Sequence, residues 1–126
     1  MKFRLILLLL GWRLVWLARR NPGFRGQLEN RDVIMQWRTF DGSVARWYHF
    51  RPARVESHHG LNPAPSVTLN FKDADYAFRT LQAAGKNQMA FMEGMQAGDI
   101  KVEGDPGHLM WFMTLMKFIA PGKSKR

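Results

Sequence analysis

Residues 66–104 constrain the fold of this chain most strongly, because a strand and a helix follow each other there within a few residues. Val67, Leu69 and Phe71 alternate with polar residues, which is the period-two pattern of a strand with one apolar face. Asp73 is suited to cap a helix, and apolar residues recur after it at helical spacing. The segment therefore predicts a strand with a helix directly behind it.

The second part of this segment predicts another helix and another strand. A methionine-rich helix opens near Asn87 and ends at Gly98. Residues 99–103 then place Ile100 and Val102 on one face and charged residues on the other. This is the pattern of a strand at the edge of a sheet, with one buried face and one solvent-exposed face.

The residues upstream of this segment predict an antiparallel meander. Segments 33–40 and 44–51 have the composition of strands, and Asp41-Gly42 between them favours a tight hairpin turn. A third short strand is expected over residues 53–57, and His58 and His59 are expected in the loop that follows it. The order of strands and helices predicts an α+β fold, in which the meander is joined to a layer of helices.

The sequence of the central segment resembles the sterol carrier protein family, the type-two nonspecific lipid-transfer domain. The most specific part is the run Gly-Asp-Ile-Lys-Val-Glu-Gly-Asp over residues 98–105, which a long apolar segment follows. The resemblance covers roughly residues 31–120. It implies a twisted, mostly antiparallel sheet of about five strands covered by helices, a hydrophobic tunnel for sterols, fatty acids or acyl chains, and no catalytic residue.

The last predicted helix is apolar on nearly every side. Asp105-Pro106 is a strong signal for its start, and the helix is expected to run to Ala120. The apolar surface of such a helix must be buried on two sides, on one side by the sheet and on the other by protein, membrane or a bound lipid. Methionines repack easily around variable apolar ligands, and they gather on segments that wall the tunnel in the resembling family. The predicted lipid-binding residues are Phe78, Met89, Phe91, Met92, Met95, Leu109, Phe112, Met113 and Met116.

Residues 1–20 predict an apolar, basic helix in front of a lipid-binding domain over residues 21–126. Its apolar part would span about 20 Å as a helix, short of the ~30 Å of a bilayer core. One interpretation is a helix that lies in a membrane interface or against a partner or second copy; the other is a helix packed on the domain's own sheet. The predicted membrane-contact residues are Trp12, Arg13, Trp16, Arg19 and Arg20.

The charge of the chain indicates an anionic partner. The net charge is +9, and residues 1–54 hold 11 Lys and Arg against 3 Asp and Glu. Phospholipid headgroups fit this distribution, and a lipid carrier that works at a membrane surface needs such a contact. Arginines and aromatics also interleave on the first strands, so a nucleic-acid-binding sheet is a weaker alternative.

Sequence motifs for catalysis are absent. The chain has no cysteine, no phosphate-binding loop, no nucleophile elbow and no His-Glu-x-x-His motif. We therefore expect no metal, no cofactor and no enzyme activity. We expect a cytoplasmic protein, peripheral on the membrane, that carries or presents a fatty acid, acyl chain, isoprenoid quinone or sterol. Its apolar first helix and cationic first strands look like those of small domains that assist isoprenoid quinone synthesis.

Overall fold

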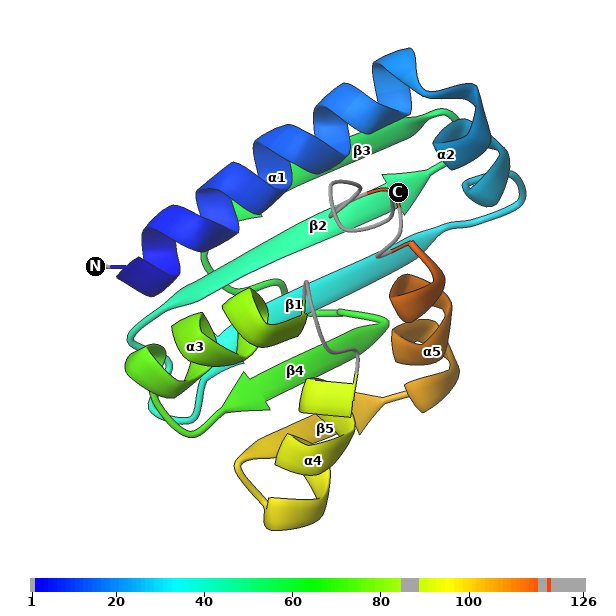
Figure 1. The fold of residues 1–126 in the computed structure, drawn as a ribbon. Helices are drawn as coiled ribbons and strands as arrows, with labels where there is room; N and C mark the ends of the chain where they lie inside the picture. Colours follow the sequence, from blue (N-terminus) through cyan, green and yellow to red (C-terminus); the bar gives the residue numbers. More distant parts are fainter. Residues whose placement is uncertain (1, 85–88, 116–117, 119–126) are drawn as a thin grey trace.

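The computed structural model describes residues 2–84, 89–115 and 118, which form a five-stranded sheet and five helices (Figure 1). The order of the strands in the sheet is β3-β2-β1-β4-β5. In chain order the elements are α1 (Lys2–Arg20), α2 (Pro22–Gln27), β1 (Val33–Thr39), β2 (Ala45–Arg51), β3 (Arg54–His59), β4 (Val67–Phe71), α3 (Ala74–Ala84), α4 (Met89–Ala97), β5 (Ile100–Gly104) and α5 (Pro106–Thr114).

The pairing of the strands confirms the α+β fold and the mostly antiparallel sheet. Strands β1, β2 and β3 form the predicted antiparallel meander, and β5 pairs antiparallel with β4. Strand β4, however, pairs parallel with β1. The loop before β4 crosses the sheet near β1, where the backbone N–H of Asn62 donates to Gln36 Oε1 at 2.6 Å and that of Ser66 donates to the Ile34 carbonyl at 2.8 Å. This crossing places β4 between β1 and β5 in the sheet.

One prediction about the meander is wrong. His58 and His59 were expected in a loop, but they are the last two residues of β3 and pair with Trp47 and Arg46 of β2. The His58 ring stacks on the Trp47 ring with their centroids 4.2 Å apart. This stacking and the pairing with β2 extend the strand by two residues beyond its apolar pattern.

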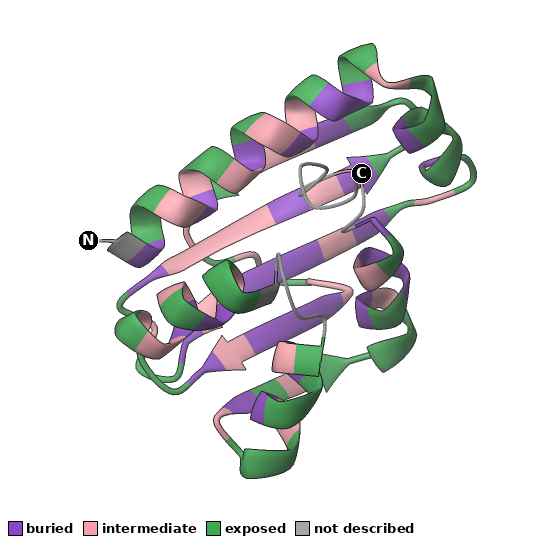
Figure 2. Cartoon of the chain, in the orientation of Figure 1, coloured by how far each residue is buried: buried purple, intermediate pink, exposed green. Residues whose placement is uncertain are grey.

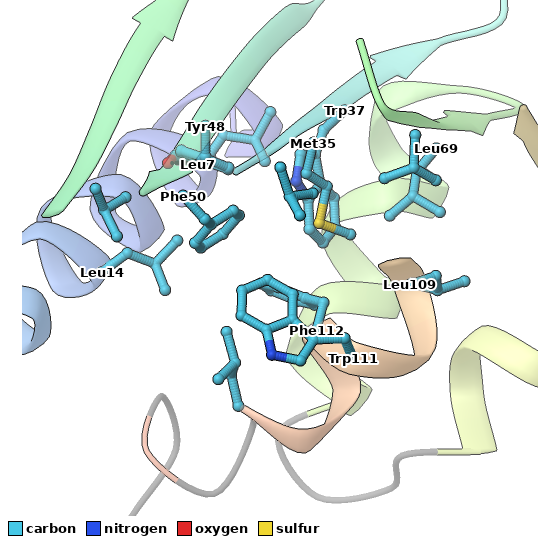
Figure 3. Close-up of a cluster of buried hydrophobic side chains, with 14 of the residues drawn as sticks. Leu7, Leu14, Met35, Trp37, Tyr48, Phe50, Leu69, Leu109, Trp111 and Phe112 are labelled. Carbon is cyan, nitrogen blue, oxygen red and sulfur yellow. Dashed lines mark hydrogen bonds between the residues drawn. The ribbon is translucent and has the colours of Figure 1, made fainter. Parts of the chain in front are cut away.

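One face of the sheet carries the core, and the helices cover it (Figures 1 and 2). At its centre Trp37 of β1 is fully buried, among aromatic rings from four other elements. Its ring centroid lies 5.4 to 6.4 Å from those of Tyr48, Phe71, Phe91 and Phe112. Figure 3 shows part of this core, where Trp37 of β1 and Tyr48 of β2 lie near Phe112 of α5. The sheet and the helical layer therefore share one core.

Helix α1 packs on the sheet of its own domain, as the second of the two interpretations of residues 1–20 expected. Phe3, Leu7 and Leu14 are buried, and the Tyr48 hydroxyl donates to the Leu7 carbonyl. A Cβ at Gly11 would lie 2.7 Å from Ser57 Oγ, so the absence of a side chain there lets the helix approach the sheet closely. Burial raises the pKa of Tyr48, so its hydroxyl remains a proton donor to α1.

The β1–β2 turn forms at Asp41-Gly42 as predicted, and Asp41 holds it. Its Oδ1 accepts from Thr39 Oγ1 at 2.7 Å and from the Ser43 N–H at 3.0 Å, while Gly42 takes a φ of 75°. These hydrogen bonds favour the charged carboxylate and lower its pKa from 3.8 to about 2.

The depressed pKa of Asp41 gives a prediction about acid stability. Its stabilising effect should be fully present above pH 3.8 and should be lost as the pH falls toward about 2, because the folded protein then has to take up a proton. Denaturant unfolding of the wild type and Asp41→Asn between pH 5 and pH 2 measures this. The difference in stability between the two proteins should shrink on acidification, and a constant difference would contradict the assignment.

Candidate functional site

The described helices enclose an apolar pocket of about 220 Å³. Helix α1 forms one wall and the helices α3, α4 and α5 form the others, so the pocket joins segments that are far apart in the sequence. It is lined by Ile6, Leu9, Leu10 and Arg13 of α1, Leu81 of α3, Phe91 of α4 and Phe112 of α5.

The inner wall of this pocket is continuous with the core. Phe91 and Phe112 line the pocket, and the ring of each also packs edge-on against Trp37, at 6.1 and 5.4 Å between centroids. Both side chains are about 1% exposed. The wall is therefore fixed from behind by the central indole, and its surface toward the pocket is purely hydrocarbon.

The outer wall comes from α1, at the border between the buried and the exposed faces of that helix. Ile6, Leu10 and Arg13 follow one another at helical spacing of three and four residues, and each is half-buried. Leu9 lines the pocket and is also 47% exposed. The pocket thus reaches the surface of the molecule beside α1.

Arg13 is the one charged residue among the described residues that line the pocket. Its Nη2 donates to the Phe118 carbonyl at 3.1 Å, and its guanidinium lies 5.3 Å from the centre of the Trp16 ring. These contacts hold the charged group at the rim while its methylenes contribute to the wall. The site can therefore take an apolar body inside and a polar group at the surface.

The predicted lipid-binding residues do not all line the pocket. Phe91 and Phe112 line the pocket, Leu109 is buried in the core, and Phe78, Met95 and Met113 are half-buried and pack against that core. Met89 and Met92 are 56% and 36% exposed. Met116 and part of the predicted helix beyond Thr114 lie outside the described residues. The pocket residues that sequence reasoning missed are Ile6, Leu9, Leu10 and Leu81.

The predicted membrane-contact residues lie mostly on the outer side of α1. Trp12 and Trp16 are 62% and 51% exposed, and Arg19 and Arg20 are exposed at the end of the helix. Arg13 differs, since it is half-buried at the pocket. Within the described ranges, no helix has the length and apolar character needed to cross a bilayer.

No acidic or histidine side chain is among the described residues that line this pocket. Among residues 2–84, 89–115 and 118, no three His, Asp or Glu side chains are arranged to hold a metal ion. The closest described His–carboxylate pair joins His49 of β2 to Asp32, the residue before β1, with Nε2 and Oδ1 2.5 Å apart. Neither residue lines the pocket. The pocket therefore presents an apolar surface to a ligand, with the Arg13 guanidinium at its rim.

Comparison with known proteins identifies the fold. No family model and no curated protein sequence matches the chain. Solved structures do match it, and they show that the chain has a sterol carrier protein-like fold, as its sequence predicts.

Three of these solved structures illustrate the match. The UbiJ-SCP2 ubiquinone synthesis protein is similar at a TM-score of 0.67 and 14% identity, over 91% of this chain and 96% of its own. A crystal structure of sterol carrier protein 2 has a TM-score of 0.58 at 10% identity, over 88% and 93% of the two chains. Palmitated SCP2L2 from Aedes aegypti has a TM-score of 0.53 at 14% identity, over 85% and 86%.

Proposed function

We propose that this protein binds a long apolar lipid in the pocket between α1 and the helices α3, α4 and α5. The ligand is a fatty acid, an acyl chain, an isoprenoid quinone or a sterol. The protein acts as a carrier that presents its ligand at a membrane surface and not as an enzyme. The observation that carries this proposal is the hydrocarbon lining of the pocket, six apolar side chains with one guanidinium at the rim.

Burial of hydrocarbon supplies the affinity in this proposal. Each buried methylene contributes about 0.8 kcal/mol, so a chain of about sixteen carbons would gain about 10 kcal/mol before the costs of ordering. The pocket of about 220 Å³ is smaller than most ligand sites, so the bound chain has to widen it. Met95 stands one turn after Phe91 and Met113 directly follows Phe112, and both are half-buried. Their unbranched side chains can repack at low cost.

The similar structures support a lipid as the ligand class. One of them is named for ubiquinone synthesis and another carries palmitate. An isoprenoid quinone and an acyl chain both have the long apolar body that the pocket lining suits. A pocket with so few polar groups favours selection by length and shape over selection by headgroup.

The outer face of α1 supports membrane presentation. Leu5, Leu9, Trp12 and Trp16 follow one another at spacings of four, three and four residues, and all are 47 to 62% exposed. An apolar stripe with tryptophans and flanking arginines is typical of a helix that lies in a membrane interface. Because Leu9 also lines the pocket, a ligand would pass between bilayer and pocket without crossing water.

A pocket-filling variant tests the proposal. We expect Leu81→Trp to lower the affinity for a fluorescent fatty acid at least about tenfold, because the larger ring occupies the space that the chain needs. The matched control is Met110→Trp, since Met110 is 57% exposed on α5 and does not line the pocket. Fluorescence titration measures affinity, and circular dichroism verifies folding. Equal uptake by the two folded variants would contradict the proposed site.

A further inference from the structure

A second concave site lies at the far end of α1 from the N-terminus. The end of α1 lies near the short helix α2 there (Figure 1). These two helices and the β2–β3 turn at Pro52-Ala53 line a groove of about 600 Å³. Three arginines line it, Arg19 and Arg20 from α1 and Arg25 from α2, together with one acidic residue, Glu29. The groove is separate from the apolar pocket, with which it shares no lining residue.

The three arginines of this groove have no partner among the described residues. None of them forms an ion pair, a side-chain hydrogen bond or a ring contact there, and all three are exposed. Other arginines of the chain are paired. Arg54 contacts Glu56 at 3.1 Å, and Arg79 contacts Asp75 at 3.2 Å. The donors of the groove are therefore available to a ligand.

Helix stability explains only part of this arrangement. Arg19 and Arg20 lie in the last turn of α1 and Arg25 lies in the last turn of α2, where the helix dipole favours positive charge. The dipoles of two helices do not require that all three arginines line one groove, where like charges repel and Glu29 supplies a single opposite charge. A bound anion removes that repulsion. Guanidinium groups match phosphate with paired, charge-assisted hydrogen bonds.

We propose that the groove of Arg19, Arg20 and Arg25 binds a phosphate group. The phosphate belongs to a lipid headgroup or is free in solution. This inference deepens the proposed function and rests on its membrane contact: exposed Trp16 precedes Arg19 by one helical turn, and tryptophan at a bilayer surface sits at the level of the headgroups. A headgroup phosphate in this groove would fix one end of α1 on the membrane, while Leu9 and the apolar pocket lie further along the same helix.

Vesicle binding by two double variants of equal charge tests the groove. Arg20→Gln with Arg25→Gln should weaken binding to phosphatidylglycerol-containing vesicles roughly tenfold or more, because each basic residue near an anionic surface contributes about a factor of five. Lys72→Gln with Arg79→Gln removes the same charge from residues that contact Asp99 and Asp75. This control should lose no more than about threefold. Co-sedimentation with vesicles measures both, and equal losses or no loss would overturn the inference.

Competition with inorganic pyrophosphate distinguishes a headgroup phosphate from free phosphate as the ligand of the groove. If pyrophosphate displaces the wild type from vesicles and binds the groove variant more weakly in calorimetry, the groove accepts free phosphate. If it does neither while the groove variant still loses vesicle binding, the ligand is a headgroup. Uptake of a fluorescent fatty acid without vesicles should be equal in all of these proteins. Loss of uptake in Leu81→Trp, by contrast, reports on the apolar pocket, so the two proposals fail separately.

Discussion

Trp37→Ala should lower the free energy of unfolding by about 3–5 kcal/mol, the cost of removing a large aromatic side chain from a well-packed core. Trp37 is fully buried, and its ring contacts side chains from β2, β4, α4 and α5. Its removal leaves a cavity that four elements would have to close together. Small domains are stable by only about 5–15 kcal/mol, so this one change would use a large part of that margin.

The matched control for Trp37→Ala is Trp47→Ala on the neighbouring strand. Trp47 is half-buried on the opposite face of the sheet, where its ring stacks on His58. We expect a loss of about 1 kcal/mol or less there. Urea unfolding followed by circular dichroism measures both variants. Similar losses for the two would mean that the core does not centre on Trp37.

Gly104→Ala should cost about 2–4 kcal/mol, because it combines backbone strain with a clash against backbone. Gly104 has a φ of 93°, in the left-handed region that favours glycine. A Cβ there would lie 2.4 Å from the Ser66 carbonyl oxygen and 3.0 Å from the Val67 Cα. No side-chain rotation relieves these contacts, so the pairing of β5 with β4 would have to loosen.

Gly98→Ala separates the two parts of this cost. Gly98 has a φ of 81°, but a Cβ there would meet no atom within 4 Å. We therefore expect only the conformational strain, about 1–2 kcal/mol. Thermal unfolding of both variants gives the comparison. If Gly98→Ala is as costly as Gly104→Ala, the close approach of β5 to the start of β4 contributes nothing measurable.

Local signals were sufficient to predict most of the elements. Asp105 Oδ1 accepts from the Gly107 N–H at 2.8 Å and Pro106 opens α5, as the dipeptide predicts. Asp73 likewise accepts from the Tyr76 N–H at 2.7 Å at the start of α3. Caps and turns of this kind involve residues only two or three apart, so a sequence pattern contains all the groups that take part.

The pairing of β4 with β1 was not predictable from such patterns. The period-two pattern of a strand indicates which of its side chains share a face, but it does not indicate which other strand pairs with it. The parallel pair depends on the crossing of residues 60–66 over the sheet, where hydrogen bonds join Asn62 to Gln36 and Ser66 to Ile34. Those contacts join residues 26 to 32 positions apart.

The candidate site was predicted only in part, for the same reason. Phe91 and Phe112 were identified because they lie in segments that resemble the walls of a lipid tunnel. The α1 side of the pocket was missed, since a helix that is apolar on nearly every side gives no indication of which stripe faces a cavity. Ile6 and Leu10 reach the pocket because Gly11 and the buried face around Leu7 set the rotation of α1 on the sheet.

The open sheet ends in β3 on one side and β5 on the other. Unpaired backbone at such edges can recruit strands from other molecules. Strand β5 carries Lys101 and Glu103, both exposed, and β3 carries Arg54 and Glu56, which form an ion pair. A foreign strand would have to desolvate these charges in order to pair. The edges thus disfavour aggregation in a protein that exposes large apolar side chains along α1.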